Sequence, residues 1–193
     1  LCYDYLYPNP ASVMAFIENH DTDRFLENGK DTLALKQAYA LLLTMRRIPQ
    51  LYYGTEILMN GTKEVTDGKD FPGGFPGDKA NKFTRKGRTA AENAMFDWTA
   101  RLLHWRKGND VIVHGKQIQF IPWHGIYVVT RQYNGRTVMT VINGRNTSGK
   151  LEVKRYAEII GNNTTAHDVC TGESVSLSAD IPLKARQTMV LEF

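Results

Sequence analysis

Four polar residues near the start of the chain have types and spacing that could do chemistry. They read Glu18-Asn19-His20-Asp21 and directly follow the short apolar run from Val13 to Ile17. An apolar run of about five residues is typical of a strand buried on both faces of a parallel sheet. In β/α barrels the carboxyl end of such a strand carries the active site, because the loop that follows faces the open mouth. A lone His-Asp pair is also common in solvated loops and helix caps, so the pattern alone leaves both interpretations open.

A helix is predicted after these residues. Asp31 and the residues just before it offer capping chemistry, and apolar residues then recur at helical spacing from Ala34 to Met45. The predicted last turn holds Arg46 and Arg47, which suit the negative end of the helix dipole.

A second short buried strand and a long connection come next. Pro49 should end the helix, and Leu51 to Tyr53 is predicted as a strand that opens onto Gly54. From Asn60 to Arg88 the chain is dense in Gly, Pro, Asp and Lys. A connection of this length in a compact domain is usually functional or mobile.

The next helix has the clearest signals in the chain. Thr89 and Glu92 have the spacing of a capping box, and Gly108 supplies a stop. Between them, apolar residues follow helical spacing, and Trp98 and Trp105 lie on the same stripe. We therefore predict both tryptophans to pack in the core.

The second half of the chain has the texture of an antiparallel sandwich. Short alternating segments are rich in β-branched and aromatic residues, and Tyr133-Asn134-Gly135-Arg136 is a strong hairpin signal. This divides the chain into residues 1–109, α/β in character, and residues 110–193, all β. The predicted strands are Gln117–Ile121, Ile126–Gln132, Thr137–Asn143, Gly149–Val153 and Gln187–Phe193.

Composition excludes several classes of protein. The chain has 193 residues, 42% of them hydrophobic, and a formal charge of +4, and no run of Lys and Arg is longer than a pair such as Arg46-Arg47, so we expect no nucleic-acid partner. The longest apolar block, Ala38 to Leu43, is too short to span a membrane. Cys2 and Cys170 have no partner spacing and are predicted to be free thiols.

The beginning of the sequence bears on the compartment. It reads Leu1-Cys2-Tyr3-Asp4, with no initiator Met and no leader pattern, which we interpret as an internal starting point. A bacterial periplasmic or secreted setting is favoured over the cytoplasm, and the compartment is otherwise open.

Three segments together resemble one enzyme family. Phe16 to Asp21 resembles the fourth conserved motif of the α-amylase family, glycoside hydrolase family 13, with the signature Phe-x-x-Asn-His-Asp. Pro49 to Glu56 resembles the eighth-strand segment of that family, and Asp70 to Asp78 is similar to the Asp-Phe-Pro-Gly-Gly-Trp-Pro-Gly-Asp stretch of its neopullulanase and cyclomaltodextrinase branch. The motifs occur in the family's order. Asp23 departs from the Pro or Ser that the branch often has before the Arg.

The resemblance implies a fold and a function. The chain would be the last quarter to third of such an enzyme: strands seven and eight of a TIM (β/α)8 barrel with their helices, then a β-sandwich domain. Asp21 would be the third catalytic carboxylate, which grips hydroxyls of the sugar beside the scissile bond. His20 would hydrogen-bond the same sugar, and Asn19 and Arg24 would also take part in substrate binding.

The same resemblance implies a retaining α-glucan hydrolase that acts on α-1,4 bonds, or also α-1,6 bonds, of starch, pullulan or cyclodextrins. Retaining glycosidases need a nucleophile and an acid/base carboxylate about 5 to 5.5 Å apart. The family carries these on barrel strands four and five, upstream of this segment. We therefore expect the chain alone to be inactive.

Several other residues have two interpretations. Glu56 could be mistaken for a catalytic acid, and we predict a structural role for it. Phe71 and Phe75 could stack on sugar rings or anchor their loop. Asp67, Asp70 and Asp78 carry oxygen ligands that calcium accepts, but their spacing fits no recognised calcium loop, so turn formation is the default and no cofactor is predicted.

Two alternatives to the hydrolase stay open. A glucanotransferase of the same family would share the three motifs, since the choice between water and sugar as acceptor depends on subsites outside them. A non-catalytic carbohydrate-binding module could be built on the sandwich, with Trp123, Tyr127 and Tyr133 as a stacking platform or as core residues. The partner in each case is an α-glucan, and the sequence is compatible with an oligomer.

Overall fold

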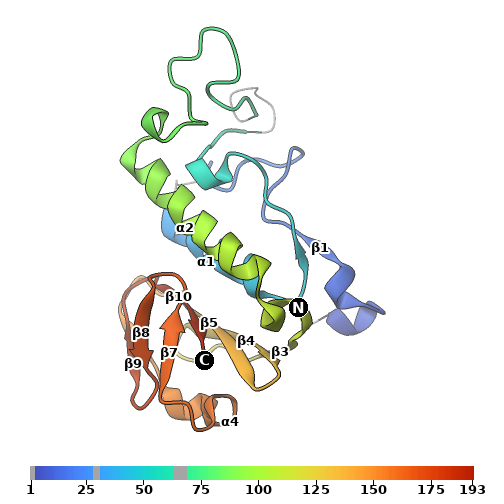
Figure 1. The fold of residues 1–193 in the computed structure, drawn as a ribbon, viewed down its shortest axis with the longest axis vertical. Coiled ribbons are helices and arrows are strands. Elements are labelled where there is room, and N and C mark those ends of the chain that lie inside the picture. Colours follow the sequence, from blue (N-terminus) through green and yellow to red (C-terminus); the bar gives the residue numbers. More distant parts are fainter. Residues whose placement is uncertain (1–2, 28–30, 63–68) are drawn as a thin grey trace.

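The computed structural model describes residues 3–27, 31–62 and 69–193. A helical region (residues 3–107) lies at one end of the molecule and a sheet region (residues 116–193) at the other, as Figure 1 shows. The short helix α3 (Asp110–His114) connects them. Short 3-10 helices occur at Asp4–Leu6, Pro10–Ser12, Thr55–Ile57, Arg85–Gly87 and Val153–Tyr156.

The helical region contains one parallel strand pair. β1 (Met14–Ala15) pairs with β2 (Ile48–Pro49), and α1 (Thr32–Thr44) connects them. β1 is shorter than the predicted strand, and burial on both faces is wrong for this chain, because Met14 is 56% exposed and Phe16 45% exposed. Over the described residues β1 pairs only with β2, so no strand is hydrogen-bonded to its other edge.

The second strand lies earlier than predicted. Leu51 to Tyr53 is irregular, and the ladder forms at Ile48–Pro49 instead. The amide of Ile48 donates to the carbonyl of Val13, just before β1, over 3.1 Å, and the amide of Gln50 donates to the Ala15 carbonyl over 2.8 Å. The intervening Pro49 needs no partner on that side, which is why proline is tolerated in this two-residue strand.

The predicted cap at the start of α1 is confirmed, because the Asp31 carboxylate accepts from the Ala34 amide over 2.8 Å. The placement of Arg46 and Arg47 in its last turn is wrong. The helix ends at Thr44, and both guanidinium groups instead pair with the carboxylate of Asp4.

The carboxyl end of α1 is satisfied from other elements. Arg106 donates to the Leu43 carbonyl, and Arg131 donates to the Thr44 carbonyl over 3.3 Å. These two arginines supply donors and positive charge at the end where a helix leaves carbonyls unpaired.

The second long helix, α2 (Ala90–Lys107), forms as predicted. Thr89 and Glu92 make the capping box, with hydrogen bonds in both directions, and Gly108 is the C-cap. Trp98 and Trp105 are half-buried and pack against the cores of the molecule.

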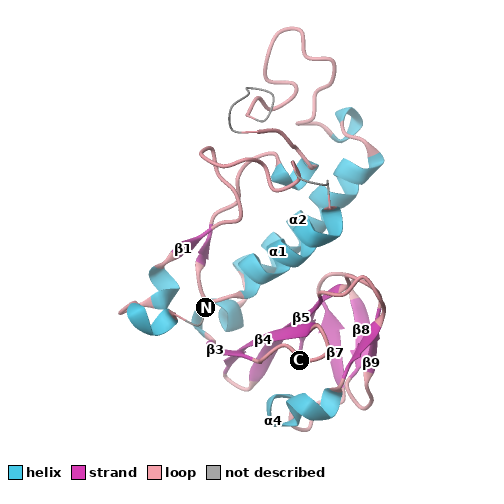
Figure 2. Ribbon diagram, turned by 180° about the vertical axis from the view of Figure 1, so that it is seen from behind, coloured by secondary structure: helices cyan, strands magenta, loops and turns pink. Residues whose placement is uncertain are grey.

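The sheet region is antiparallel throughout, and it fits a β-sandwich (Figure 2). The predicted hairpin is confirmed, with Asn134 and Gly135 at φ of 49° and 76° between two paired strands. Three strands and two short helices, α3 and α4 (Ala157–Ile160), were not predicted. The large sheet has the order β3 (Lys116–Gln119), β4 (Ile126–Tyr133), β5 (Arg136–Asn143), β10 (Thr188–Glu192), β7 (Thr165–Asp168), β8 (Glu173–Ser176), and the small sheet pairs β6 (Gly149–Leu151) with β9 (Ile181–Leu183).

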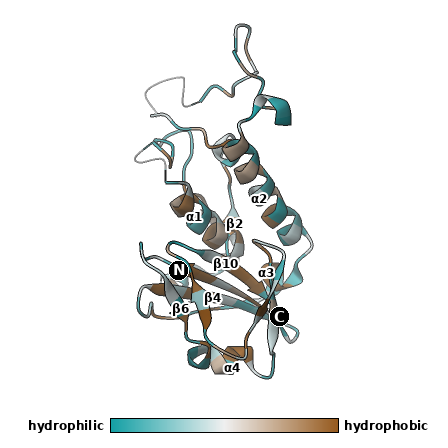
Figure 3. Ribbon diagram, turned by 90° about the vertical axis from the view of Figure 1, so that its left-hand side faces the viewer, coloured by the Kyte–Doolittle hydropathy of each residue, from teal (hydrophilic) through white to brown (hydrophobic). Residues whose placement is uncertain are grey.

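Two cores organise this region. One lies within the sheet region and includes Val128, Leu151 and Leu191. The other joins the sheet to the helices, with Leu43 of α1 and Leu102 of α2 among its members. Figure 3 shows hydrophobic residues along the strands and on part of α1 and α2. Over the described residues, none of the helices combines the length and the apolar character that crossing a bilayer requires.

Candidate functional site

The parallel pairing of β1 and β2 brings two chain segments to the same end of the helical region. One is the turn from Asn19 to Thr22, after β1. The Asn19 side chain accepts from the Asp21 amide over 2.9 Å, and the Asn19 amide donates to the Thr22 hydroxyl over 3.0 Å. Asn19 therefore shapes the turn that presents the next two residues.

His20 and Asp21 project from this turn into solvent. Their side chains are 73% and 75% exposed, and Nε2 of His20 lies 3.4 Å from Oδ2 of Asp21. The pair offers a carboxylate that can accept hydrogen bonds and an imidazole that can donate or accept. A ligand rich in hydroxyl groups has partners for both.

Arg24 lies behind the turn and is buried. Its Nη1 is 3.2 Å from Oε1 of Glu18, and both side chains are only 2% exposed. Glu18 belongs to the polar cluster after the apolar run, but its sequence context predicted no role of its own for it. The signal that could have indicated a role for Glu18 is Arg24, a residue of opposite charge six positions later, because the two residues flank the turn.

The second segment at this end is the exit of β2. The Arg24 guanidinium lies 4.0 Å from the centre of the Tyr52 ring and donates to the Tyr53 carbonyl over 2.7 Å. Asn19, His20, Tyr52 and Lys69 border one narrow crevice. The structure therefore places the turn against the exit of the neighbouring strand.

The loop after residue 68 reaches the same end. The Phe71 ring lies 4.3 Å from that of Phe83 and 6.5 Å from that of Tyr53, whereas Phe75 is 55% exposed. Asp78 accepts from the amides of Phe75 and Gly73, and these backbone bonds hold the pKa of its carboxyl below its usual value. Turn formation, the default interpretation of Asp78, is confirmed.

Ion pairs and a cation–π contact tie this loop to α2. Lys82 pairs with Glu92, and the Arg88 guanidinium lies 4.0 Å from the centre of the Phe96 ring. Arg85 pairs with Asp97 through two contacts of 2.8 and 3.0 Å.

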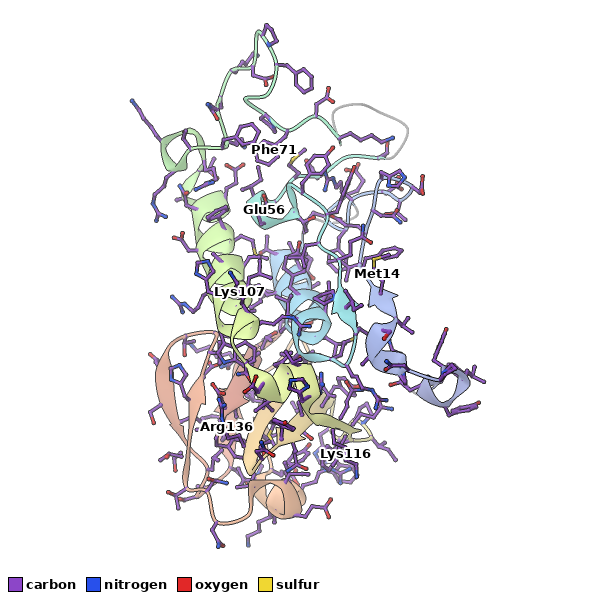
Figure 4. All side chains as sticks on the ribbon, turned by 45° about the vertical axis from the view of Figure 1, so that its right-hand side comes forward. Met14, Glu56, Phe71, Lys107, Lys116 and Arg136 are labelled. Atoms are coloured by element: carbon purple, nitrogen blue, oxygen red, sulfur yellow. The ribbon has the colours of Figure 1, made fainter. Side chains whose placement is uncertain are left out.

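Two adjoining pockets lie between the β2 exit and α2. Their volumes are about 260 and 370 Å³, and both are lined by Tyr53, Glu56 and Phe96. Figure 4 shows Glu56 and Phe71 in the part of the molecule away from Lys116 and Arg136 of the sheet region. Neither pocket is lined by Asn19, His20 or Asp21.

Within the described ranges, no cluster of His, Cys, Asp or Glu could hold a metal ion. Asp67, one of the three aspartates considered for calcium, lies outside the described residues. Cys2 lies outside them as well, whereas Cys170 is a buried free thiol.

Comparison with known proteins shows which sequences this chain resembles. Residues 117–192 match the model of the cyclo-malto-dextrinase C-terminal domain. An α-amylase of Niallia circulans is 29% identical over 171 residues, which is 83% of this chain and 29% of that protein. A cyclomaltodextrin glucanotransferase of Thermoanaerobacterium thermosulfurigenes is 29% identical over 186 residues, 92% of this chain and 23% of that protein. The chain thus spans about a quarter of the length of these relatives.

Solved structures agree on the fold. An α-amylase of Anoxybacillus superposes with a TM-score of 0.74 at 20% identity, covering 97% of this chain and 39% of that one. A maltogenic α-amylase of Thermotoga neapolitana superposes with a TM-score of 0.72 at 22% identity, covering 99% and 43%.

Proposed function

Since this chain is similar over most of its length to the C-terminal part of α-amylase-family enzymes, we propose that it supplies the last two strand–helix units of a β/α barrel and the sandwich domain that follows. The parallel β1–α1–β2 unit supports this. So do the exposed side chains of Met14, Phe16 and Ile48, which further barrel strands would cover. The two domains are then residues 1–109 and 110–193.

The longer enzyme acts on α-1,4, or also α-1,6, glucosidic bonds of starch, pullulan or cyclodextrins. The observation that carries this proposal is the exposed His20–Asp21 pair at the carboxyl end of β1, beside the exit of β2. Barrel enzymes place their active sites at this end.

The residues of the turn then have distinct roles. Asp21 accepts hydrogen bonds from hydroxyls of the sugar beside the scissile bond, and these contacts tighten as the ring flattens toward an oxocarbenium-like state. His20 binds the same sugar. Asn19 forms the turn, and Arg24 acts on substrate indirectly, because its side chain is buried.

The loop contributes in two ways. Phe75 is exposed and stacks on a sugar ring. Phe71 anchors the loop, because its ring packs on Phe83 and lies near the Tyr53 ring. Glu56 keeps a structural role in the wall between the β2 exit and α2.

Bond cleavage by retention needs a carboxylate nucleophile and a facing acid/base carboxylate, which we assign to the upstream part of the barrel. The test compares the purified 193-residue chain with the longer protein on starch, pullulan and cyclodextrin. We expect activity from the longer protein and none from the chain. Hydrolysis by the chain alone would contradict the proposal, as would a longer protein that is inactive on all three substrates.

A glucanotransferase is the second candidate, because several of the similar curated relatives are cyclomaltodextrin glucanotransferases. Product analysis separates the two activities. A hydrolase releases reducing ends in proportion to bonds cleaved, whereas a transferase forms cyclic or elongated glucans with few new reducing ends.

Of the three aromatic residues considered for a stacking platform on the sheet region, two have contacts of different kinds. Tyr133 packs against the core between the sheet and the helices, and Trp123 stacks on His124 at 4.5 Å in the β3–β4 connection. The Tyr133 ring therefore packs on a core, whereas the Trp123 ring lies in a connection between strands.

A further inference from the structure

We propose that Glu18 and Arg24 are positioning residues, which hold the turn that carries His20 and Asp21 against the exit of β2. The catalytic meaning of this inference rests on the function proposed for Asp21. The contacts that carry it do not depend on any substrate.

The Glu18 carboxylate closes the loop that contains the turn. One oxygen lies 3.2 Å from Nη1 of Arg24, and the other accepts from the Phe25 amide. Glu18 precedes the turn and Phe25 follows it, so a single carboxylate binds both ends of the loop. Both charged side chains are 2% exposed.

Arg24 then joins this closed loop to the second strand. Its Nη1 donates to the Tyr53 carbonyl over 2.7 Å, and its guanidinium lies over the Tyr52 ring at 4.0 Å. Thr55, just beyond that exit, donates its hydroxyl to Glu18. The loop after β1 and the segment after β2 therefore share one buried ion pair.

The turn itself is shaped by local contacts, and the Arg24 amide just beyond it donates to the Gly61 carbonyl over 3.0 Å. Within the described residues, the hydrogen bonds of Asn19 and Asp21 are local to the turn that ends at Thr22. These bonds shape the turn but do not orient it relative to β2. Burying a charged pair has a desolvation penalty, so we do not expect the pair to add much stability. Its role is to specify one arrangement of the two segments.

Substituting Arg24→Lys tests the geometry while keeping the charge. An ammonium group cannot contact Glu18 and the Tyr53 carbonyl in the planar arrangement that also lies over Tyr52. The matched control is Arg85→Lys, because Arg85 also pairs with a carboxylate, but its side chain is 68% exposed.

The first measurement is ¹⁵N relaxation of the 193-residue chain. Backbone order parameters of residues 19–23 are expected to be about 0.85 in the parent chain and to fall below about 0.6 in the Arg24→Lys variant, with α2 unchanged. The control should leave residues 19–23 unchanged. Unaltered order in these residues in the folded Arg24→Lys variant overturns the proposal. If that variant does not fold, Thr55→Val removes one hydrogen bond to Glu18, and the same loss of order confined to residues 19–23 is required.

The second measurement uses the longer enzyme. Arg24→Lys is expected to lower kcat about 10- to 100-fold, with KM changed less than about 3-fold, at a temperature where circular dichroism shows a folded protein. A lower melting temperature with unchanged kcat would mean a purely structural role and would overturn the proposal. If Asp21→Asn leaves turnover unchanged, the proposed function fails, and the relaxation result still decides whether the pair orders the turn.

Discussion

The sheet region and the helical region satisfy their strands in different ways. Six of the sheet region's strands form one antiparallel sheet, and its core buries Val128, Leu151 and Leu191 almost completely. The helical region has a single parallel ladder of two residue pairs, with Met14 and Ile48 exposed. The sheet region thus buries its strands in its own core. The helical region also has a core, around Leu35, Tyr39 and Met95, but within the described residues its strand pair leaves the side chains of Met14 and Ile48 exposed.

Where the two regions meet, buried polar contacts fix how they pack. The Thr140 hydroxyl on β5 donates to the Thr44 hydroxyl at the end of α1 over 2.7 Å. Arg131 on β4 donates to the Thr44 carbonyl, and burial lowers its pKa to about 10. The sheet region therefore serves as the base on which the α1 end of the β1–α1–β2 unit is held.

The largest expected difference in unfolding free energy is between two apolar side chains, one in each region, that are each shortened to alanine. Leu191→Ala removes a fully buried side chain and is expected to lower the free energy of unfolding by about 2–5 kcal/mol. Met14→Ala removes a side chain that is more than half exposed and should change it by less than about 0.5 kcal/mol in this chain. Urea denaturation followed by circular dichroism measures both. Equal losses would contradict the contrast, and a larger loss for Met14→Ala in the longer protein would show that this side chain is covered there.

The contact between the regions should have an intermediate effect. Thr44→Val leaves the buried Thr140 hydroxyl without its acceptor and is expected to cost about 1–3 kcal/mol of unfolding free energy. The double variant Thr44→Val/Thr140→Val should recover part of this loss, since no unpaired hydroxyl then remains at β5. Strictly additive losses would mean that the two hydroxyls do not interact.

Cys170 reports on the same junction through its thiol. Burial, with Asp168 nearby, raises its pKa from 9.0 to about 12, so at pH 8 the folded chain should react with iodoacetamide about a thousandfold more slowly than the unfolded chain. In a Cys2→Ser background, mass spectrometry with and without urea measures this ratio. Because the unfolded chain loses this proton near pH 9 and the folded chain keeps it to about pH 12, stability should fall as the pH rises through that interval. Fast labelling of the folded chain would show that the junction is open.

The smallest effect is expected from the ion pair between the loop and α2. Asp97→Asn breaks an ion pair whose side chains are 68% and 46% exposed, so solvent screens it and the unfolding free energy should change far less than for Thr44→Val. The change should shrink further in 1 M salt. A loss as large as that from Thr44→Val would refute the view that this pair is a solvent-exposed contact.

The elements that could be predicted from the sequence are those with local signals. Capping residues and apolar spacing fixed both ends of α2, and Asn134-Gly135 fixed the β4–β5 hairpin. β7 and β8 have four residues each and carry mainly polar or small side chains, so their pairing with the sheet could not be read from periodicity. The predicted position of β2 was wrong because Pro49 was expected to precede the strand. A proline can lie within a strand when its nitrogen does not face the neighbouring strand, and the sequence does not show which way Pro49 faces.

The site shows the same division. The position of Asn19, His20 and Asp21 at a strand end followed from the apolar run before them, and the structure brings Asn19 and His20 beside Tyr52. The burial of Arg24 could not be predicted, because a charged residue near a polar turn is usually exposed and its partner Glu18 lies on the other side of that turn.

The most direct test of the proposed site is the turnover of the longer enzyme carrying Asp21→Asn. This substitution keeps the shape of the side chain and removes the negative charge that the proposal places on the hydroxyls of the distorted sugar. We predict a fold unchanged by circular dichroism and a loss of several kcal/mol of transition-state stabilisation, which lowers kcat on starch by about a thousandfold or more. A variant that keeps near-native kcat would show that the turn after β1 is not part of the catalytic site.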